Sequence, residues 1–138
     1  METKYESEVK HLHYSQQQVY AKLSDFSHLQ SLKERVDDQR LQSLEFEPDT
    51  ISFDIAPVGA MRLCVVEREE PKLVKMEAEQ SPLPFTFWIQ LLPTGDNSSK
   101  MKLTLQTDLN PFIRTMVGGK LQEAINKMAD TLAALPYE

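Results

Sequence analysis

The chain has 138 residues, of which 41% are hydrophobic and 26% are charged, which is ordinary for a single folded domain and excludes a wholly disordered chain. Its formal net charge of -6 disfavours nucleic acid as a partner and disfavours electrostatic docking on anionic membranes. The single cysteine, Cys64, excludes an intrachain disulfide and a multi-cysteine metal site. We therefore treat residues 1–138 as one domain.

The N-terminal residues, the apolar runs and the single cysteine predict the cellular compartment of the protein. Residues 1–9 are charged and lack the apolar core of a signal peptide. No apolar run approaches the roughly 20 residues that cross a bilayer. A lone cysteine also suits a reducing compartment. These features predict a cytoplasmic protein without a membrane span.

The first part of the chain alternates and then becomes helical. Residues 3–13 have period two, which predicts a strand. The side chains expected on one face of that strand are Tyr5, Ser7, Val9 and His11. Ser15 followed by Gln18 forms a capping-box pattern and predicts a helix over about 16–25. A second short helix is expected over about 27–35.

From about residue 39 to residue 110 the hydrophobic period is two. The apolar positions fall into six short groups separated by turn-forming residues, which predicts an antiparallel meander with one covered face. These groups are Leu44 and Phe46; Ile51, Phe53 and Ile55; Met61, Leu63 and Val65; Val74, Met76 and Ala78; Phe85, Phe87, Ile89 and Leu91; and Met101, Leu103, Leu105, Thr107 and Leu109.

A long amphipathic helix is expected at the C-terminus. Asn110 is a good N-cap and Pro111 suits the first helical position. Apolar residues then repeat at steps of three and four: Ile113, Val117, Leu121, Ala124, Met128, Leu132 and Leu135. A helix of about 25 residues would be about 37 Å long.

The order of these elements predicts an architecture. One long helix must bury its apolar stripe, and the meander needs a cover of similar length. We expect an α+β helix-grip fold, in which a curved antiparallel seven-stranded sheet encloses the C-terminal helix and two short helices follow the first strand. A flat sheet with all three helices on one face is the alternative.

Two segments resemble a known superfamily. The opening "ESEVKHLHYSQQQVYAKLSDFSHLQSL", with Val19-Tyr20-Ala21-Lys22-Leu23-Ser24-Asp25 on the first helix, resembles the start of START-related (SRPBCC) domains. The closing "NPFIRTMVGGKLQEAINKMADTLA" resembles their C-terminal helix. The superfamily includes pollen allergens, lipid-transfer domains, polyketide cyclases and chaperone activators. The resemblance implies a hydrophobic cavity between sheet and helix, and it carries over no catalytic motif.

The inward positions of the predicted fold would line that cavity. The apolar set is Phe53, Leu63, Met76, Phe85, Phe87, Leu103, Val117, Leu121, Ala124 and Met128. Such a set would hold a small hydrophobic molecule, and methionine suits a tolerant pocket. The alternative is a filled core, because protein interiors are normally close-packed.

Polar groups on the same face would orient the polar end of a ligand. The candidates are Tyr5, Ser7, His11 and Thr107. Their inward placement depends on the register of the first strand, because a slip of one residue turns every side chain to the other face. The alternative is that they lie solvated at strand ends.

Several other features have more than one interpretation. Gly118 and Gly119 inside a helix cost about 1 kcal/mol each, which fits a bend or ligand entrance, a close helix-on-sheet approach, or a helix that starts after them. His11 and His13 lack an evident third metal ligand, so we expect no metal and no cofactor. The acidic clusters around 67–70 and 77–79 are expected to form a solvated rim.

The outer sheet face carries Trp88, which alternates with inward neighbours. Cys64, Val66 and Leu92 share that outer parity, so this face near Trp88 would serve a homodimer or a protein partner if one exists. Scattered outer apolar residues are also normal.

Three functions follow from these features. The first is non-enzymatic binding or transfer of a lipid, sterol-like or polyketide-like molecule. The second is a cyclase or dehydratase with His11 or Tyr5 as polar catalyst. The third is a protein-interaction module resembling the chaperone activators.

Overall fold

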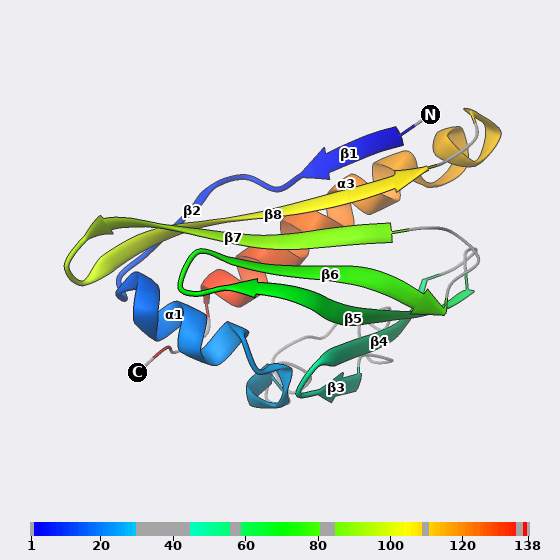
Figure 1. The fold of residues 1–138 in the computed structure, drawn as a ribbon. Coiled ribbons are helices and arrows are strands. Elements are labelled where there is room, and N and C mark those ends of the chain that lie inside the picture. The colour runs from blue at the N-terminus through cyan, green and yellow to red at the C-terminus, as the bar shows by residue number, and fades with distance from the viewer. Residues whose placement is uncertain are drawn as a thin grey trace.

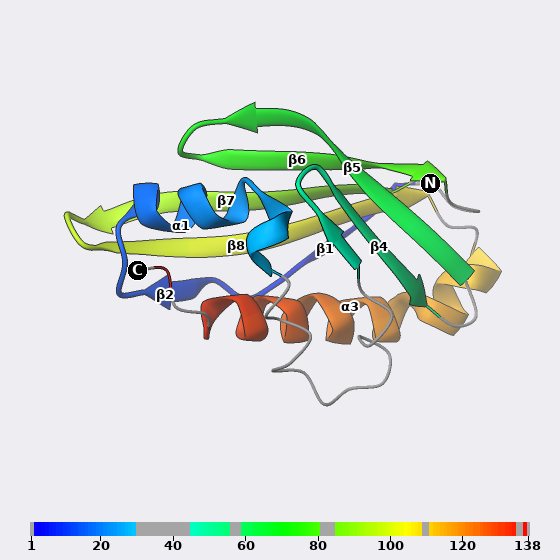
Figure 2. The ribbon, with the colours of Figure 1, turned by 90° about the horizontal axis from the view of Figure 1, so that it is seen from below.

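The computed structural model shows a curved antiparallel sheet with a long helix across its concave face (Figure 1). A view turned by 90° shows a shorter helix on the same face, under one end of the sheet (Figure 2). The structure describes residues 2–29, 45–55, 59–80, 85–108, 111–134 and 137.

The strands of the described residues form one sheet. Its order is β1-β8-β7-β6-β5-β4-β3, and β2 also pairs with β8. Neighbouring strands are antiparallel, so the predicted meander and the helix-grip fold are confirmed. The elements are β1 (Glu2–Glu6), β2 (Lys10–Leu12), α1 (Gln16–Leu23), the 3-10 helix η1 (Phe26–Leu29), β3 (Glu45–Glu47), β4 (Thr50–Ile55), β5 (Gly59–Glu69), β6 (Leu73–Gln80), β7 (Phe85–Gly95), β8 (Ser98–Asp108) and α3 (Pro111–Ala133).

The predicted first strand is interrupted by a bulge. The Ser7 amide donates a hydrogen bond to the Leu103 carbonyl, and the Leu103 amide donates one to the Ser7 hydroxyl. Lys10 is paired in register with Met101. Two residues, 8 and 9, therefore lie opposite one residue of β8, which is the arrangement of a β-bulge. The extra residue shifts the alternation, so Lys10 and Leu12 take the inner parity. The expectation that His11 faces inward is wrong, and His11 is exposed.

The first helix begins as its sequence predicts. The Ser15 side chain accepts a hydrogen bond from the Gln18 backbone, and the Gln18 side chain accepts one from the Ser15 backbone. This capping box satisfies two amide groups that the helix itself leaves unpaired. The second expected helix appears as the 3-10 helix η1, and residues 30–35 lie outside the described part of the chain.

The long helix α3 runs through both glycines without a break. Its buried residues are Leu121, Ile125, Ala129 and Leu132. The predicted stripe placed Ala124 on this face, which is wrong, because Ala124 is exposed. The buried face is rotated by about one residue because polar residues of α3 contact β1 and β2.

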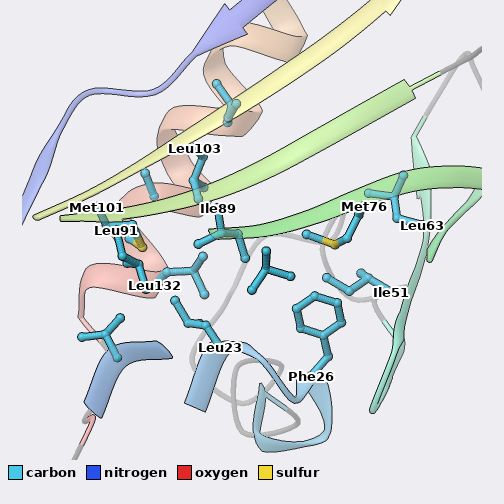
Figure 3. Packing of buried hydrophobic residues seen from close by; sticks show 14 of the residues in the cluster. Leu23, Phe26, Ile51, Leu63, Met76, Ile89, Leu91, Met101, Leu103 and Leu132 are labelled. Atoms are coloured by element: carbon cyan, nitrogen blue, oxygen red, sulfur yellow. The ribbon is translucent and has the colours of Figure 1, made fainter. Parts of the chain in front are cut away.

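The end of the concave face under α1 is densely filled. Leu23 of α1 and Phe26 of η1 point towards Ile51, Met76 and Ile89 of the sheet, while Leu132 of α3 meets Leu91 and Met101 (Figure 3). All of these side chains are buried. Here the sheet, α1, η1 and the C-terminal half of α3 form a close-packed core.

Candidate functional site

A row of inner-face side chains crosses the middle of the sheet. Tyr5 of β1 is paired with Leu105 of β8, Leu105 with Phe87 of β7, and Phe87 with Met76 of β6. We call these four residues the central row. Tyr5 and Met76 are buried, but Phe87 and Leu105 are only half-buried.

The rows on both sides of the central row are buried. Ile89 and Leu103 lie on the α1 side, and Phe85 and Thr107 lie on the other side. The partial exposure of Phe87 and Leu105 therefore does not come from fraying at an end of the sheet. The concave face is therefore covered less completely at Phe87 and Leu105 than in the rows beside them.

The long helix flanks the central row along the β1 edge. In the described part of the chain, its main contacts are with β8, β1 and β2. Leu121 and Ile125 are buried there, and Met128 is half-buried. The side of α3 that carries Ala124 and Met128 therefore keeps apolar surface accessible.

A ladder of polar contacts fixes α3 against the β1 edge. Gln122 Nε2 donates a 2.9 Å hydrogen bond to the Glu6 carbonyl oxygen, and the Glu8 amide donates a 3.3 Å bond to Asn126 Oδ1. Asp130 forms an ion pair with Lys10 and raises the pKa of that lysine. Positions 122, 126 and 130 lie four apart on the helix, a rise of about 6 Å, which matches two residues of a strand.

Gly118 lies one further helical step along this ladder, where Tyr5 contacts α3. A Cβ atom at Gly118 would lie 3.1 Å from the Tyr5 hydroxyl oxygen, which is tighter than an ordinary contact. No such neighbour surrounds Gly119, where a Cβ would meet nothing within 4 Å. The close helix-on-sheet approach is therefore correct for Gly118, and it does not account for Gly119.

Two hydroxyl groups on the inner face of β1 have no hydrogen-bond partner among the described residues. Tyr5 is 8% exposed, and its hydroxyl donates to none of them. The buried Thr3 Oγ1, two residues earlier on the same face, also lacks a partner. Ser7 differs, because its hydroxyl accepts from the Leu103 amide and donates to the Glu8 carbonyl. Ser7 therefore holds the bulge and is not available to a ligand.

The predicted lining residues fall into several groups. Leu63, Met76, Phe85, Leu103, Leu121 and Tyr5 are buried; Phe87 and Met128 are half-buried; Ala124 and His11 are exposed. The side chains of Phe53 and Val117 lie outside the described ones. That any of these residues contacts a ligand stays a prediction.

Two residues of the site were not among the predicted lining set. Leu105 has the inner parity of its strand, and the alternation alone would have identified it. Thr3 lies at the start of the predicted strand, and its importance depends on an unmet hydrogen bond that no sequence pattern reveals.

The remaining candidates do not join the central row. Among the residues that the structure describes, no group of three His, Cys, Asp or Glu side chains could hold a metal ion. Trp88 lies on the outer face, paired in register with Lys75, whose Nζ is 5.8 Å from the ring centroid. A dimer or protein partner on that face stays a prediction. Within the described helices, none is long and apolar enough to span a bilayer.

Comparison with solved structures shows the same fold. Norcoclaurine synthase from Thalictrum flavum, solved with dopamine and hydroxybenzaldehyde, matches with a TM-score of 0.74 at 13% identity, over 96% of this chain and 85% of that chain. A conserved protein from Geobacillus kaustophilus matches at 0.63 and 19% identity, over 96% and 93%. A START superfamily protein from Mycobacterium smegmatis matches at 0.58 and 13% identity, over 95% and 98%.

At the level of sequence, no curated protein matches this chain. The family model described as polyketide cyclase / dehydrase and lipid transport matches residues 4–135. This match covers nearly the whole chain and agrees with the START-related resemblance of the sequence. The protein therefore belongs to the polyketide cyclase/dehydrase and lipid transport family.

Proposed function

We propose that this protein binds or transfers a small apolar molecule, such as a lipid, a sterol-like or a polyketide-like compound, on the concave face beside α3. The observation that carries the proposal is the half-buried state of Phe87 and Leu105 between two buried rows. A close-packed core would have covered them. A guest molecule at this place would take the position that a core side chain occupies elsewhere.

The chemistry of the surroundings suits an apolar guest. Among the described residues, the partly buried hydrophobic side chains packed against the core include Val65, Ala78, Phe87, Leu105 and Met128. Apolar burial contributes about 25 cal/mol per Å² before the costs of association. Methionine side chains adapt to guests of different shape, so we expect a tolerant site.

A fluorescence titration with N-phenyl-1-naphthylamine tests this proposal. The neutral probe is expected to bind and to brighten as it leaves water. Ala78→Phe should fill the space from β6 and reduce binding at least tenfold. Ala21→Phe adds the same side chain on the exposed side of α1 and should leave binding unchanged. Absence of binding to the natural protein, or unchanged binding by Ala78→Phe, would refute the proposal. Native mass spectrometry with fatty acids, sterols and aromatic polyketides would then identify the guest class.

A cyclase or dehydratase activity is a second candidate. It is supported by the unpaired Tyr5 hydroxyl at the end of the central row and by the family to which the chain belongs. A phenol can donate or accept a proton during such a reaction. Incubation with an aromatic polyketide precursor tests it: turnover that Tyr5→Phe abolishes without loss of binding supports an enzyme, and unchanged turnover excludes this role for Tyr5.

A further inference from the structure

The inner face of β1 presents two hydroxyl groups with unmet hydrogen bonds beside the central row. Thr3 is paired in register with Thr107, and Tyr5 with Leu105, so both have inner parity. Their Cα atoms are two residues apart, or about 7 Å. Thr3 Oγ1 is buried and has no partner, which costs about 1–3 kcal/mol and is rare in native proteins, whereas the Tyr5 hydroxyl is not among the buried atoms that lack a partner.

Neither hydroxyl has a hydrogen-bond partner among the described residues. Tyr5 lies against Gly118, which has no side chain, and its hydroxyl oxygen is 3.1 Å from the point that a Cβ atom on that glycine would occupy. The third hydroxyl of this edge, on Ser7, is already occupied by the backbone. The Tyr5 hydroxyl therefore lies at one end of the central row, and Thr3 lies at the same end of the neighbouring row, paired with Thr107. An apolar surface with a few placed polar groups is the usual arrangement of a ligand site.

We propose that Thr3 and Tyr5 form the polar subsite for the guest, and that the guest carries a neutral oxygen group, a hydroxyl or a carbonyl, at its β1 end. This inference rests on the proposed function and names the chemistry of its ligand. A neutral oxygen can use both hydroxyls, because each donates one hydrogen bond and accepts others. A carboxylate would lose far more hydration than two neutral hydroxyls restore.

Three probes of similar shape distinguish these chemistries: 2-naphthol, 2-methylnaphthalene and 2-naphthoate. Titration of the full chain should show 2-naphthol binding about five- to tenfold more tightly than 2-methylnaphthalene, as one or two net hydrogen bonds provide. The anionic 2-naphthoate should bind more weakly than 2-naphthol.

The variants Tyr5→Phe and Thr3→Val remove the hydroxyls and keep the shapes. In the double variant, 2-naphthol and 2-methylnaphthalene should bind with about equal affinity, while the affinity for 2-methylnaphthalene stays unchanged. Tyr14→Phe is the matched control, because Tyr14 lies beside Ser99 at the opposite end of β8 and should keep the full preference.

The outcomes separate the two proposals. If 2-methylnaphthalene and 2-naphthol bind equally to the natural protein, the site is apolar and the polar subsite is refuted while the proposed function stands. A preference that survives in the double variant, or tightest binding of 2-naphthoate, also refutes the subsite. If no probe binds, the proposed function fails and the subsite fails with it.

Discussion

The hydroxyl oxygen of Tyr5 lies 3.1 Å from the point that a Cβ atom on Gly118 would occupy. This contact joins the first strand to the first half of the long helix, four residues before the polar ladder begins at Gln122. The missing side chain lets a tyrosine ring reach the helix backbone. Gly118 thus sets how closely α3 approaches the sheet beside the central row.

The two glycines should respond differently to alanine. Gly119→Ala adds a methyl group in open space, so it should stabilise the protein by about 1 kcal/mol through helix propensity. Gly118→Ala should gain less, because its methyl group presses on the Tyr5 hydroxyl. Urea unfolding of both variants measures the difference. In a Tyr5→Phe background the stability gained by Gly118→Ala should approach that gained by Gly119→Ala. If the two variants gain equal stability in the natural background, the contact between Tyr5 and Gly118 is contradicted.

The polar ladder should contribute measurable stability. Gln122→Ala removes the hydrogen bond to the Glu6 carbonyl and should lower the free energy of unfolding by about 0.5–1.5 kcal/mol. Lys120→Ala, on the exposed side of the same helix, should change it by less than about 0.5 kcal/mol. Chemical denaturation compares the two, and equal effects would show that the contact adds nothing.

The C-terminal tyrosine should make the protein sensitive to alkali. Burial raises the pKa of the Tyr137 phenol well above its ordinary value of 10.0, and the hydroxyl donates to the Leu132 carbonyl. The unfolded phenol ionises near pH 10 while the folded one keeps its proton. The unfolded state then holds fewer protons, so the free energy of unfolding falls above pH 10, by up to about 1.4 kcal/mol per pH unit.

Unfolding of Tyr137→Phe provides the test of this titration. The variant should show a shallower decline between pH 9.5 and 11.5, although it loses some stability at pH 7 with the hydrogen bond. A decline as steep as that of the natural protein would assign the alkaline sensitivity to other groups.

The sequence predicted most of the fold because its periods change cleanly. The alternation from Ile51 to Thr107 indicates strands, and the steps of three and four after Pro111 indicate one long helix. Both patterns come from the burial of one face, which the amino-acid order displays directly.

The two errors have one origin, which is contact between the first strand and the last helix. The bulge at residues 8 and 9 leaves no mark in the alternation, so His11 was placed on the wrong face. On α3, Ala124 and Ala129 are the same residue type, so periodicity could not choose between them. Polar contacts of Gln122 and Asn126 with the β1 edge decide the rotation, and hydrophobic patterns do not report such contacts.

The candidate site was harder to predict than the fold. Inward parity was readable for Phe87 and Leu105, but whether an inward residue is covered depends on the volumes of residues far apart in sequence. The pairing of Thr3 with Thr107, and the lack of a partner for its hydroxyl, likewise appear only once β1 is docked on β8.

The most direct test of the central claim is to locate a bound probe by NMR on methyl-labelled protein. With N-phenyl-1-naphthylamine bound, we expect intermolecular NOEs to the methyl groups of Leu105 and Met128. The methyl groups of Leu91 and Leu132 in the filled core should show none. NOEs confined to Val66 and Leu92, which are exposed outside the concave face, would contradict the claim that a guest is held between the sheet and α3.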